Sequence, residues 1–253
     1  MSPRILKSLL GKNVTINFIT MELFKTIILL FAFLFSMNTM TAQQKSHSTN
    51  VTTETKMNYL LYEPPGSLEK APLLVFLHGG GEGGNNIEAV KKHGLPMLVE
   101  NGKVFPFYIL SPQNPYEKGF WDDRAVAELI DKIVKEYPVD ESRIYLAGLS
   151  RGGYGAWRLA MNNPGRFAAM LVICGASAPD NYAGWIKDIP VWVFHGEKDQ
   201  TIPASESINM VKALKEQGAE VKLTLYPDAG HDSWTEAFNN DEVFEWLLSH
   251  QNK

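Results

Sequence analysis

The sequence has little that would hold a chain together covalently or around a metal cluster. It contains a single cysteine, Cys174, which excludes an intrachain disulfide framework and every multi-cysteine zinc or iron–sulfur site. It also lacks a basic excess: the formal net charge is −4, which argues against nucleic acid as a partner. With 45% hydrophobic and 21% charged residues among 253, the composition is typical of a single globular domain.

Long apolar runs are also scarce, and the one candidate lies near the N-terminus. After Met21 and Lys25 comes an apolar run at 26–35, followed by small polar residues up to Ala42. This layout is typical of a secretory signal, and the run is too short to span a bilayer of about 30 Å comfortably. We therefore predict an upstream segment and signal peptide over residues 1–42, with Met21 as an alternative start and an uncleaved membrane anchor as the alternative interpretation.

Export changes the charge and the expected surroundings of the protein. Cleavage after Ala42 removes four basic groups and one acidic group from the totals of 24 and 28, which leaves a net charge of −7. Such an acidic protein is not expected to bind anionic lipid or nucleic acid, so no stable membrane association should remain after cleavage. We expect a periplasmic or extracellular protein with a polar stretch at 43–56 and a single domain at 57–253.

Beyond residue 56, short apolar runs alternate with amphipathic stretches. The predicted strands are 57–62, 73–77, 107–110, 143–147, 168–173, 191–194 and 221–226, and the predicted helices are 123–136, 153–162, 205–217 and 233–249. This alternation predicts an α/β fold, a doubly wound and mostly parallel sheet with helices on both faces. Such sheets bind ligands beyond the carboxyl ends of their strands. About fifteen residues separate Cys174 from Pro190, so no large lid is expected there.

The strongest chemical signal is the segment Gly148-Leu149-Ser150-Arg151-Gly152, which lies between a predicted strand and a predicted helix. A serine on such a tight turn stands clear of the sheet, and the flanking glycines let neighbouring backbone approach. We predict Ser150 as a nucleophile. The backbone amide of Arg151 should point to where negative charge develops on an attacked carbonyl. A glycine-rich helix cap is the structural alternative.

A second glycine-rich segment, His78-Gly79-Gly80-Gly81, follows the predicted strand 73–77. Consecutive glycines leave backbone N–H groups unobstructed, so Gly80 or Gly81 should supply the second donor of an oxyanion hole. A phosphate-binding loop would need Gly-Lys-Ser/Thr after the glycines, whereas Glu82-Gly83-Gly84-Asn85 follow here. The sequence therefore excludes that interpretation.

A serine nucleophile needs a base, and the base needs a carboxylate to orient it. Asp199 lies in the loop after the predicted strand 191–194, and His231 follows the last predicted strand, 221–226. Both loops belong to the carboxyl edge of a parallel sheet. The order Ser150, Asp199, His231 is one of the chain orders that serine hydrolases use.

Four segments of the sequence, HGGG, GLSRGGYGA, HGEKDQTIP and AGHDSW, together resemble the α/β-hydrolase superfamily. Within it they are similar to the compact carboxylesterases of the phospholipase/carboxylesterase and dienelactone-hydrolase-like groups. The resemblance extends from about Lys56 to the C-terminus. It implies that Ser150, Asp199 and His231 act as nucleophile, orienting acid and base, and that neither a metal nor a cofactor takes part.

Several neighbouring residues compete with these assignments. His195 is expected to brace the acid loop, and His78 to be satisfied by backbone below the oxyanion loop. Asp228 and Asp232 flank His231, but carboxylates so near in sequence usually face solvent, so Asp199 is preferred as the acid. Cys174 is expected to be a small buried hydrophobe.

Three further residues beside the motifs are candidates for substrate contact: Glu82, Trp121 and Trp234. A role in the core is the alternative for Trp121. The leading hypothesis is a secreted serine hydrolase that cleaves carboxylic esters, such as short-acyl or aromatic-acid esters of polysaccharides. A serine peptidase of the prolyl-oligopeptidase type and a non-catalytic binding module on the same fold are the alternatives.

Overall fold

The structure, a computed structural model, describes residues 54–66, 69–178 and 180–252. The predicted signal peptide and residues 43–53 lie outside these described residues. Among the residues that are described, no helix is both long and apolar enough to cross a membrane.

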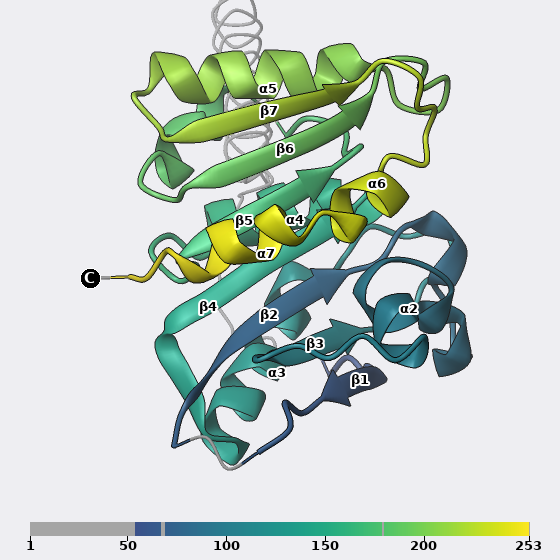
Figure 1. Cartoon of the computed structure of the whole chain (residues 1–253), viewed down its shortest axis with the longest axis vertical. Helices are drawn as coiled ribbons and strands as arrows, with labels where there is room; N and C mark the ends of the chain where they lie inside the picture. The colour runs from purple at the N-terminus through teal and green to yellow at the C-terminus, as the bar shows by residue number, and fades with distance from the viewer. Residues whose placement is uncertain (1–53, 67–68, 179, 253) are drawn as a thin grey trace, which may run out of the picture. The chain divides into compact units, whose positions relative to one another are not determined.

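The described residues form one seven-stranded sheet in the order β1-β3-β2-β4-β5-β6-β7 (Figure 1). The strands are β1 (Tyr59–Tyr62), β2 (Ala71–Leu77), β3 (Tyr108–Pro112), β4 (Val139–Leu149), β5 (Ala169–Ile173), β6 (Val191–Gly196) and β7 (Val221–Tyr226). All neighbouring pairs are parallel except β1 and β3, which are antiparallel. The connection after β2 runs toward β3 on one side, whereas the connection after β4 runs toward β5 on the other side. The carboxyl ends of the neighbouring strands β2 and β4 therefore form a topological switch point, where such sheets bind ligands.

Helices cover both faces of this sheet. The α-helices are α2 (Gly94–Glu100), α3 (Asp123–Glu136), α4 (Arg151–Asn162), α5 (Ala204–Glu216), α6 (Trp234–Asn239) and α7 (Asp241–Leu248), and the 3-10 segments are η1 (Gly80–Glu82), η2 (Ile87–Lys92) and η3 (Asp180–Ile186). In Figure 1, α2, α6 and α7 lie on the near face, while α3 and α4 lie behind the sheet. The apolar residues of α5 belong to the same core cluster as those of α3 and α4.

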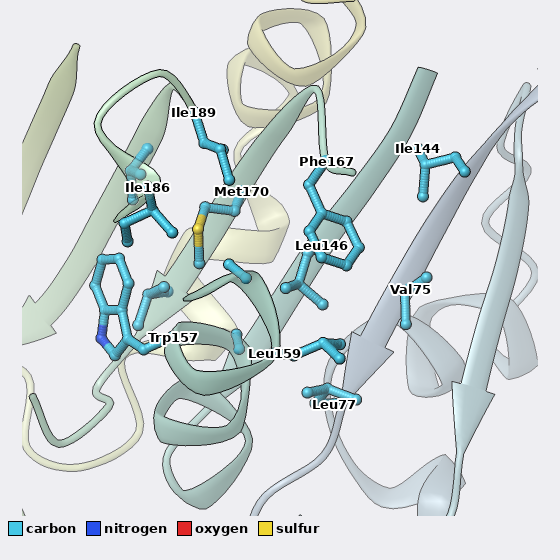
Figure 2. Packing of buried hydrophobic residues seen from close by; sticks show 14 of the residues in the cluster. Val75, Leu77, Ile144, Leu146, Trp157, Leu159, Phe167, Met170, Ile186 and Ile189 are labelled. Atoms are coloured by element: carbon cyan, nitrogen blue, oxygen red, sulfur yellow. The ribbon is translucent and has the colours of Figure 1, made fainter. Parts of the chain in front are cut away.

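Each central strand divides its side chains between the two faces, as a pleated strand must. In β4, Ile144 and Leu146 pack on the side of α3, α4 and α5, whereas Tyr145 and Ala147 pack on the side of α2, α6 and α7. Figure 2 shows the first of these cores, where Trp157 of α4 packs among residues from the sheet and the connecting loops. The buried strands fix the positions of their own carboxyl ends, where the loops with Gly80, Ser150 and Asp199 begin.

The predicted fold class is confirmed, and all seven predicted strands are present. Two details differ from the expectation. The predicted helix 233–249 is two short helices, because Asn240 has an extended backbone and its side chain accepts a hydrogen bond from the amide of Glu242, capping α7. The short helix α2 was not predicted, since Pro96 lies inside it and its seven residues are too few for a clear period.

Candidate active site

Ser150 lies at the turn between β4 and α4. Its φ of 53° is in the left-handed region, which is costly for any residue with a Cβ. The flanking glycines allow the turn. A Cβ on Gly152 would lie 2.0 Å from the carbonyl oxygen of Leu77, and a Cβ on Gly148 would lie 2.2 Å from the carbonyl oxygen of Gly152. The amide of Ser150 donates to the carbonyl of Ile173, which holds the turn against β5.

A chain of hydrogen bonds links Ser150 to two residues that are distant in sequence. His231 Nε2 lies 2.9 Å from Ser150 Oγ, and His231 Nδ1 lies 2.7 Å from Asp199 Oδ2. A carboxylate can only accept, so Nδ1 carries the proton and Nε2 is free to accept from the serine hydroxyl. The three residues that the motifs predicted are therefore brought together in hydrogen-bonding order.

Asp199 is held as a charged acceptor. Its Oδ1 accepts from the backbone amides of Thr201 and Ile202 at 2.8 and 2.9 Å, and its side chain is fully buried. Burial raises the pKa of this carboxyl, but the hydrogen bonds from His231 and the two amides outweigh it, so the pKa is lower than usual. The carboxylate is thus ionised and fixed while it faces the imidazole.

A second histidine, His195, contacts the loop after β6 that holds Asp199. It is fully buried, and its Nε2 lies 2.9 Å from the carbonyl oxygen of Ile202 and 3.2 Å from Asp199 Oδ2. Its Nδ1 lies 2.7 Å from Ser207 Oγ at the start of α5. Because Ser207 and the loop occupy both ring nitrogens, His195 has the bracing position that its motif predicted.

The oxyanion motif forms the short segment η1 beyond the end of β2, and Gly80 and Gly81 are exposed there. The amide of Arg151 lies in the first turn of α4, where helix N–H groups have no partner within the helix. His78 lies below the loop: its Nε2 accepts from the amide of Asn114 at 3.0 Å, so its Nδ1 donates to the carbonyl of Gly79 at 2.7 Å. Burial lowers the pKa of His78 to about 4, so this ring is neutral at pH 7.

A groove of about 550 Å³ lies beside the oxyanion loop. Its lining comes from residues 84–85, just after η1, and from residues 115–119 in the loop that follows β3. One lining residue is the aromatic Tyr116, which is 54% exposed. A Cβ on Gly83 would lie 2.7 Å from the carbonyl oxygen of Tyr116, so the two loops that line the groove are in close contact beside it.

Residues 64–244 match the phospholipase/carboxylesterase family, which is more than half of the chain. The chain belongs to this family. The seven-stranded, mostly parallel sheet agrees with the α/β-hydrolase fold of the solved structures that resemble it.

Relatives of this carboxylesterase-family protein include esterases and a peptidase. A thermostable esterase superposes with a TM-score of 0.69 at 34% identity, covering 79% of this chain and 60% of its own. A bifunctional acetylxylan esterase/xylanase of Neocallimastix patriciarum is 24% identical over 62% of this chain, and dipeptidyl-peptidase 5 of Porphyromonas gingivalis is 22% identical over 64%. The chain spans 23% and 31% of these two curated relatives, which are much longer.

The three candidates for substrate contact have different surroundings. Trp121 is 3% exposed and packs in the core against Gly155 and His78, so the expectation of substrate contact does not fit its burial. Glu82 is also buried, with its carboxylate 3.7 Å from His78 Nδ1. Trp234 is half-buried, and its ring lies edge-on to His231 at 5.5 Å. Of these three residues, only Trp234 has a ring contact with His231, which links Ser150 and Asp199.

The competing carboxylates near His231 face solvent. Asp228 is 96% exposed at its side chain and pairs with Lys198 at 2.6 Å, and Asp232 accepts from the amide and hydroxyl of Thr235 at the start of α6. Cys174 is fully buried, and burial raises the pKa of its thiol to about 12. None of these three side chains belongs to the hydrogen-bonded chain at Ser150.

Two buried polar residues near the site were not singled out from the sequence. Gln113 donates through Nε2 to the carbonyls of Glu82 and Asn86, and the amide of Asn114 donates to His78. Both come directly after β3, and both are essentially unexposed. Two amide side chains immediately after an apolar strand were the available signal, because polar residues at a carboxyl strand edge are positioned to hold loops.

Proposed function

We propose that this protein hydrolyses carboxylic esters, with Ser150 as nucleophile and a covalent acyl-enzyme as intermediate. One observation carries the proposal: Ser150 Oγ on the strained turn is 2.9 Å from His231 Nε2, and His231 is held by buried Asp199. This is the arrangement that activates a serine hydroxyl at neutral pH. Membership of the phospholipase/carboxylesterase family supports it.

The proposed reaction has two halves with the same proton carrier. His231 Nε2 takes the proton from Ser150 Oγ as the oxygen bonds to the ester carbonyl carbon, and gives it to the departing alcohol oxygen as the ester bond breaks. In the second half a water molecule loses a proton to Nε2 and attacks the acyl carbon, and Ser150 leaves with that proton. Asp199 stays ionised throughout and stabilises the imidazolium that forms in each half.

Negative charge develops on the carbonyl oxygen in both halves of this reaction. In the proposal, the backbone amide of Arg151 and that of Gly80 or Gly81 donate to this oxygen. Donors fixed by the fold are already aligned when the charge appears, which is why one such donor contributes about 10²–10³ in kcat.

For the substrate class, we propose short-acyl or aromatic-acid esters of polysaccharides. The acetylxylan esterase activity in the name of one relative supports this choice. The exposed side chain of Tyr116 in the groove beside the oxyanion loop offers an aromatic surface for the aromatic acid of such an ester.

Fluorophosphonate labelling and a matched pair of substrates test the reaction. The purified protein should be labelled at Ser150, and it should cleave p-nitrophenyl acetate much faster than an aminoacyl anilide. Faster anilide cleavage would favour the peptidase alternative, which the similarity to a dipeptidyl-peptidase supports. A protein that is neither labelled nor active on esters would be a binding module. A panel of acetyl, butyryl, octanoyl and feruloyl esters then ranks the acyl groups.

Export is a separate part of the proposal, supported by the signal-like layout of residues 21–42. Full-length protein should appear outside the cytoplasm with Gln43 as its first residue, measured by N-terminal sequencing of the exported material. A chain that starts at Gln43 should remain in the cytoplasm. Retention of the full-length protein in the cytoplasm would contradict export.

A further inference from the structure

The side chain of Arg151 connects two loops at the candidate site. Its Nη2 donates to the carbonyl of Gly80 at 2.9 Å, and its Nη1 donates to the carbonyl of Glu117 at 2.7 Å. The first contact lies on the oxyanion loop and the second on the loop that lines the groove. The guanidinium therefore contacts both the oxyanion loop and the loop that lines the groove, while the backbone amide of Arg151 is the candidate donor to the oxyanion.

Holding the carbonyl of Gly80 also fixes an amide. The peptide unit is planar, and in a trans peptide the C=O of one residue and the N–H of the next point in opposite directions. The carbonyl of Gly80 belongs to the same peptide as the N–H of Gly81, so Arg151 sets the direction of that N–H. His78 does the same for the preceding peptide, because its Nδ1 donates to the carbonyl of Gly79 and so orients the N–H of Gly80.

Gly80 and Gly81 of the oxyanion loop have no side chains that could pack and hold their peptides. A Cβ on Gly81 would meet nothing within 4 Å, and a Cβ on Gly80 would meet only the Arg151 side chain, at 4.0 Å. Glycine backbone is also the most mobile when it is not held. The two side-chain hydrogen bonds therefore restrict the rotation of the peptides that carry the candidate donors.

The charge of Arg151 adds to this geometric effect. A guanidinium stays protonated at any ordinary pH, and a hydrogen bond from a charged donor is about twice as strong as a neutral one. When a peptide carbonyl accepts such a bond, the N–H at the other end of the peptide becomes a better donor. Arg151 is therefore suited both to orient and to polarise the Gly80–Gly81 peptide.

On this basis we infer that the Arg151 side chain is a positioning residue for the oxyanion hole. It holds the Gly80–Gly81 peptide so that the loop amide meets the carbonyl oxygen of the substrate, while the backbone amide of Arg151 supplies the other donor. This inference rests on the proposed function. It assigns the guanidinium no contact with substrate.

Substitutions of Arg151 keep its backbone amide and so isolate the side chain. Arg151→Ala and Arg151→Met should lower kcat for p-nitrophenyl acetate about ten- to a hundredfold, which is less than the loss of an entire donor. KM should change by less than about threefold, because this small ester does not reach the groove. Arg151→Lys should recover part of kcat, and added guanidinium chloride at millimolar concentration should restore Arg151→Ala in a saturable way.

Arg143→Met is the matched control. Arg143 is also partly buried and makes a 2.7 Å contact, to Asp140, but it lies in the amino-terminal half of β4, away from the turn at Ser150. Its replacement should leave kcat and the rate of fluorophosphonate labelling unchanged. The labelling rate also gives a readout that does not depend on the ester chosen, and it should fall in Arg151→Ala and Arg151→Met together with kcat.

The outcomes separate the inference from the proposed function. Wild-type labelling with equally fast labelling of both Arg151 variants would overturn the positioning role and leave the hydrolase intact. So would a loss of activity that follows a fall in melting temperature and that neither lysine nor guanidinium restores, because that pattern indicates a structural role alone. A wild-type protein that is neither labelled nor active would overturn both.

Discussion

The interior of the sheet and its carboxyl edge are built from different kinds of residue. In the interior, β2, β5 and the buried part of β4 from Ile144 to Leu149 are apolar on both faces. At the edge, buried polar side chains gather, and the two described non-glycine residues with positive φ, Ser150 and Cys174, both lie there. The interior can be formed by many apolar sequences of similar volume, whereas the edge depends on individual groups.

The apolar interior stabilises the fold, whereas the strained and buried polar groups at the carboxyl edge reduce its stability. A strained residue such as Ser150 costs of order 1–3 kcal/mol, and a buried carboxylate such as Asp199 is tolerated only because four groups contact it. Changes at the edge should therefore reduce activity more than stability, and changes in the interior should do the reverse.

Ser150→Ala should abolish ester hydrolysis and leave the fold intact. Loss of the nucleophile of such a triad costs on the order of 10⁶ in kcat, and the side chain of Ser150 contributes little packing. Steady-state kinetics and circular dichroism check the two halves of the prediction. A variant that kept a tenth of the wild-type turnover would contradict the role of Ser150.

Ser150→Gly is the matched variant for strain. It removes the same hydroxyl, but glycine tolerates the φ of 53° at this position. It should therefore be inactive and yet more stable than Ser150→Ala by about 1 kcal/mol in urea unfolding. Equal stability of the two variants would show that the turn stores no strain.

Asp199→Asn should cost about 10⁴ in kcat with little change in fold. The asparagine oxygen can still accept from Thr201 and Ile202, but the NH₂ then faces His231 Nδ1 and favours the wrong tautomer of the imidazole. The controls are Asp228→Asn and Asp232→Asn, which change exposed carboxylates on the histidine loop and should each cost less than about tenfold. A crippling effect from either control, with an active Asp199→Asn, would mean that the acid is misassigned.

Phe167→Ala tests the interior. Phe167 is 1% exposed and packs in the core just before the amino end of β5 (Figure 2). Ser150 contacts the other end of this strand, where its amide donates to the carbonyl of Ile173. Truncation of Phe167 should lower the free energy of unfolding by about 3–5 kcal/mol and the melting temperature by roughly 10 °C. Below that temperature kcat should stay within about threefold of wild type. A large loss of kcat in a folded variant would mean that interior and edge are not separable.

The same contrast explains what could be predicted from the sequence. The central strands β2 and β5 were predictable because burial on both faces requires continuous apolar runs. The partly buried strand β7 and the amphipathic helix α3 match their predicted ranges through their alternating and helical patterns. His231 and Asp199 were predictable as partners of Ser150 because each follows a predicted strand of the parallel sheet, in the chain order of serine hydrolases. The glycines around Ser150 indicated the tight turn. In both cases a local pattern records a constraint imposed by the fold.

Other features leave no local pattern. Arg151 follows the serine, and nothing in the sequence indicates that its guanidinium reaches Gly80 and Glu117, which are 71 and 34 residues away. Trp121 lies in the loop between the carboxyl end of β3 and the start of α3. Its ring nevertheless packs in the core, because Gly155 has no side chain and leaves room for it. These outcomes depend on how separate segments pack, which periodicity does not determine.

The pH dependence of stability should report on His78, a neutral buried group at the carboxyl edge of the sheet. Its pKa in the folded protein is about 4, compared with 6.5 for an ordinary histidine, because burial disfavours the charged ring. The unfolded chain therefore binds more protons between these values, so the free energy of unfolding should fall as the pH falls from about 6.5 toward 4. Between pH 7 and 4.5 this one group should account for roughly 2–3 kcal/mol of lost stability.

His78→Gln isolates this contribution from the other titrating groups. Glutamine can replace one donor and one acceptor, but it does not titrate in this range. The variant will be less stable than wild type at pH 7, and that difference should shrink by roughly 2–3 kcal/mol at pH 4.5, measured by urea unfolding at both values. A difference that stays constant with pH would mean that His78 is not held neutral by burial, and that the oxyanion loop rests on a ring that can be charged.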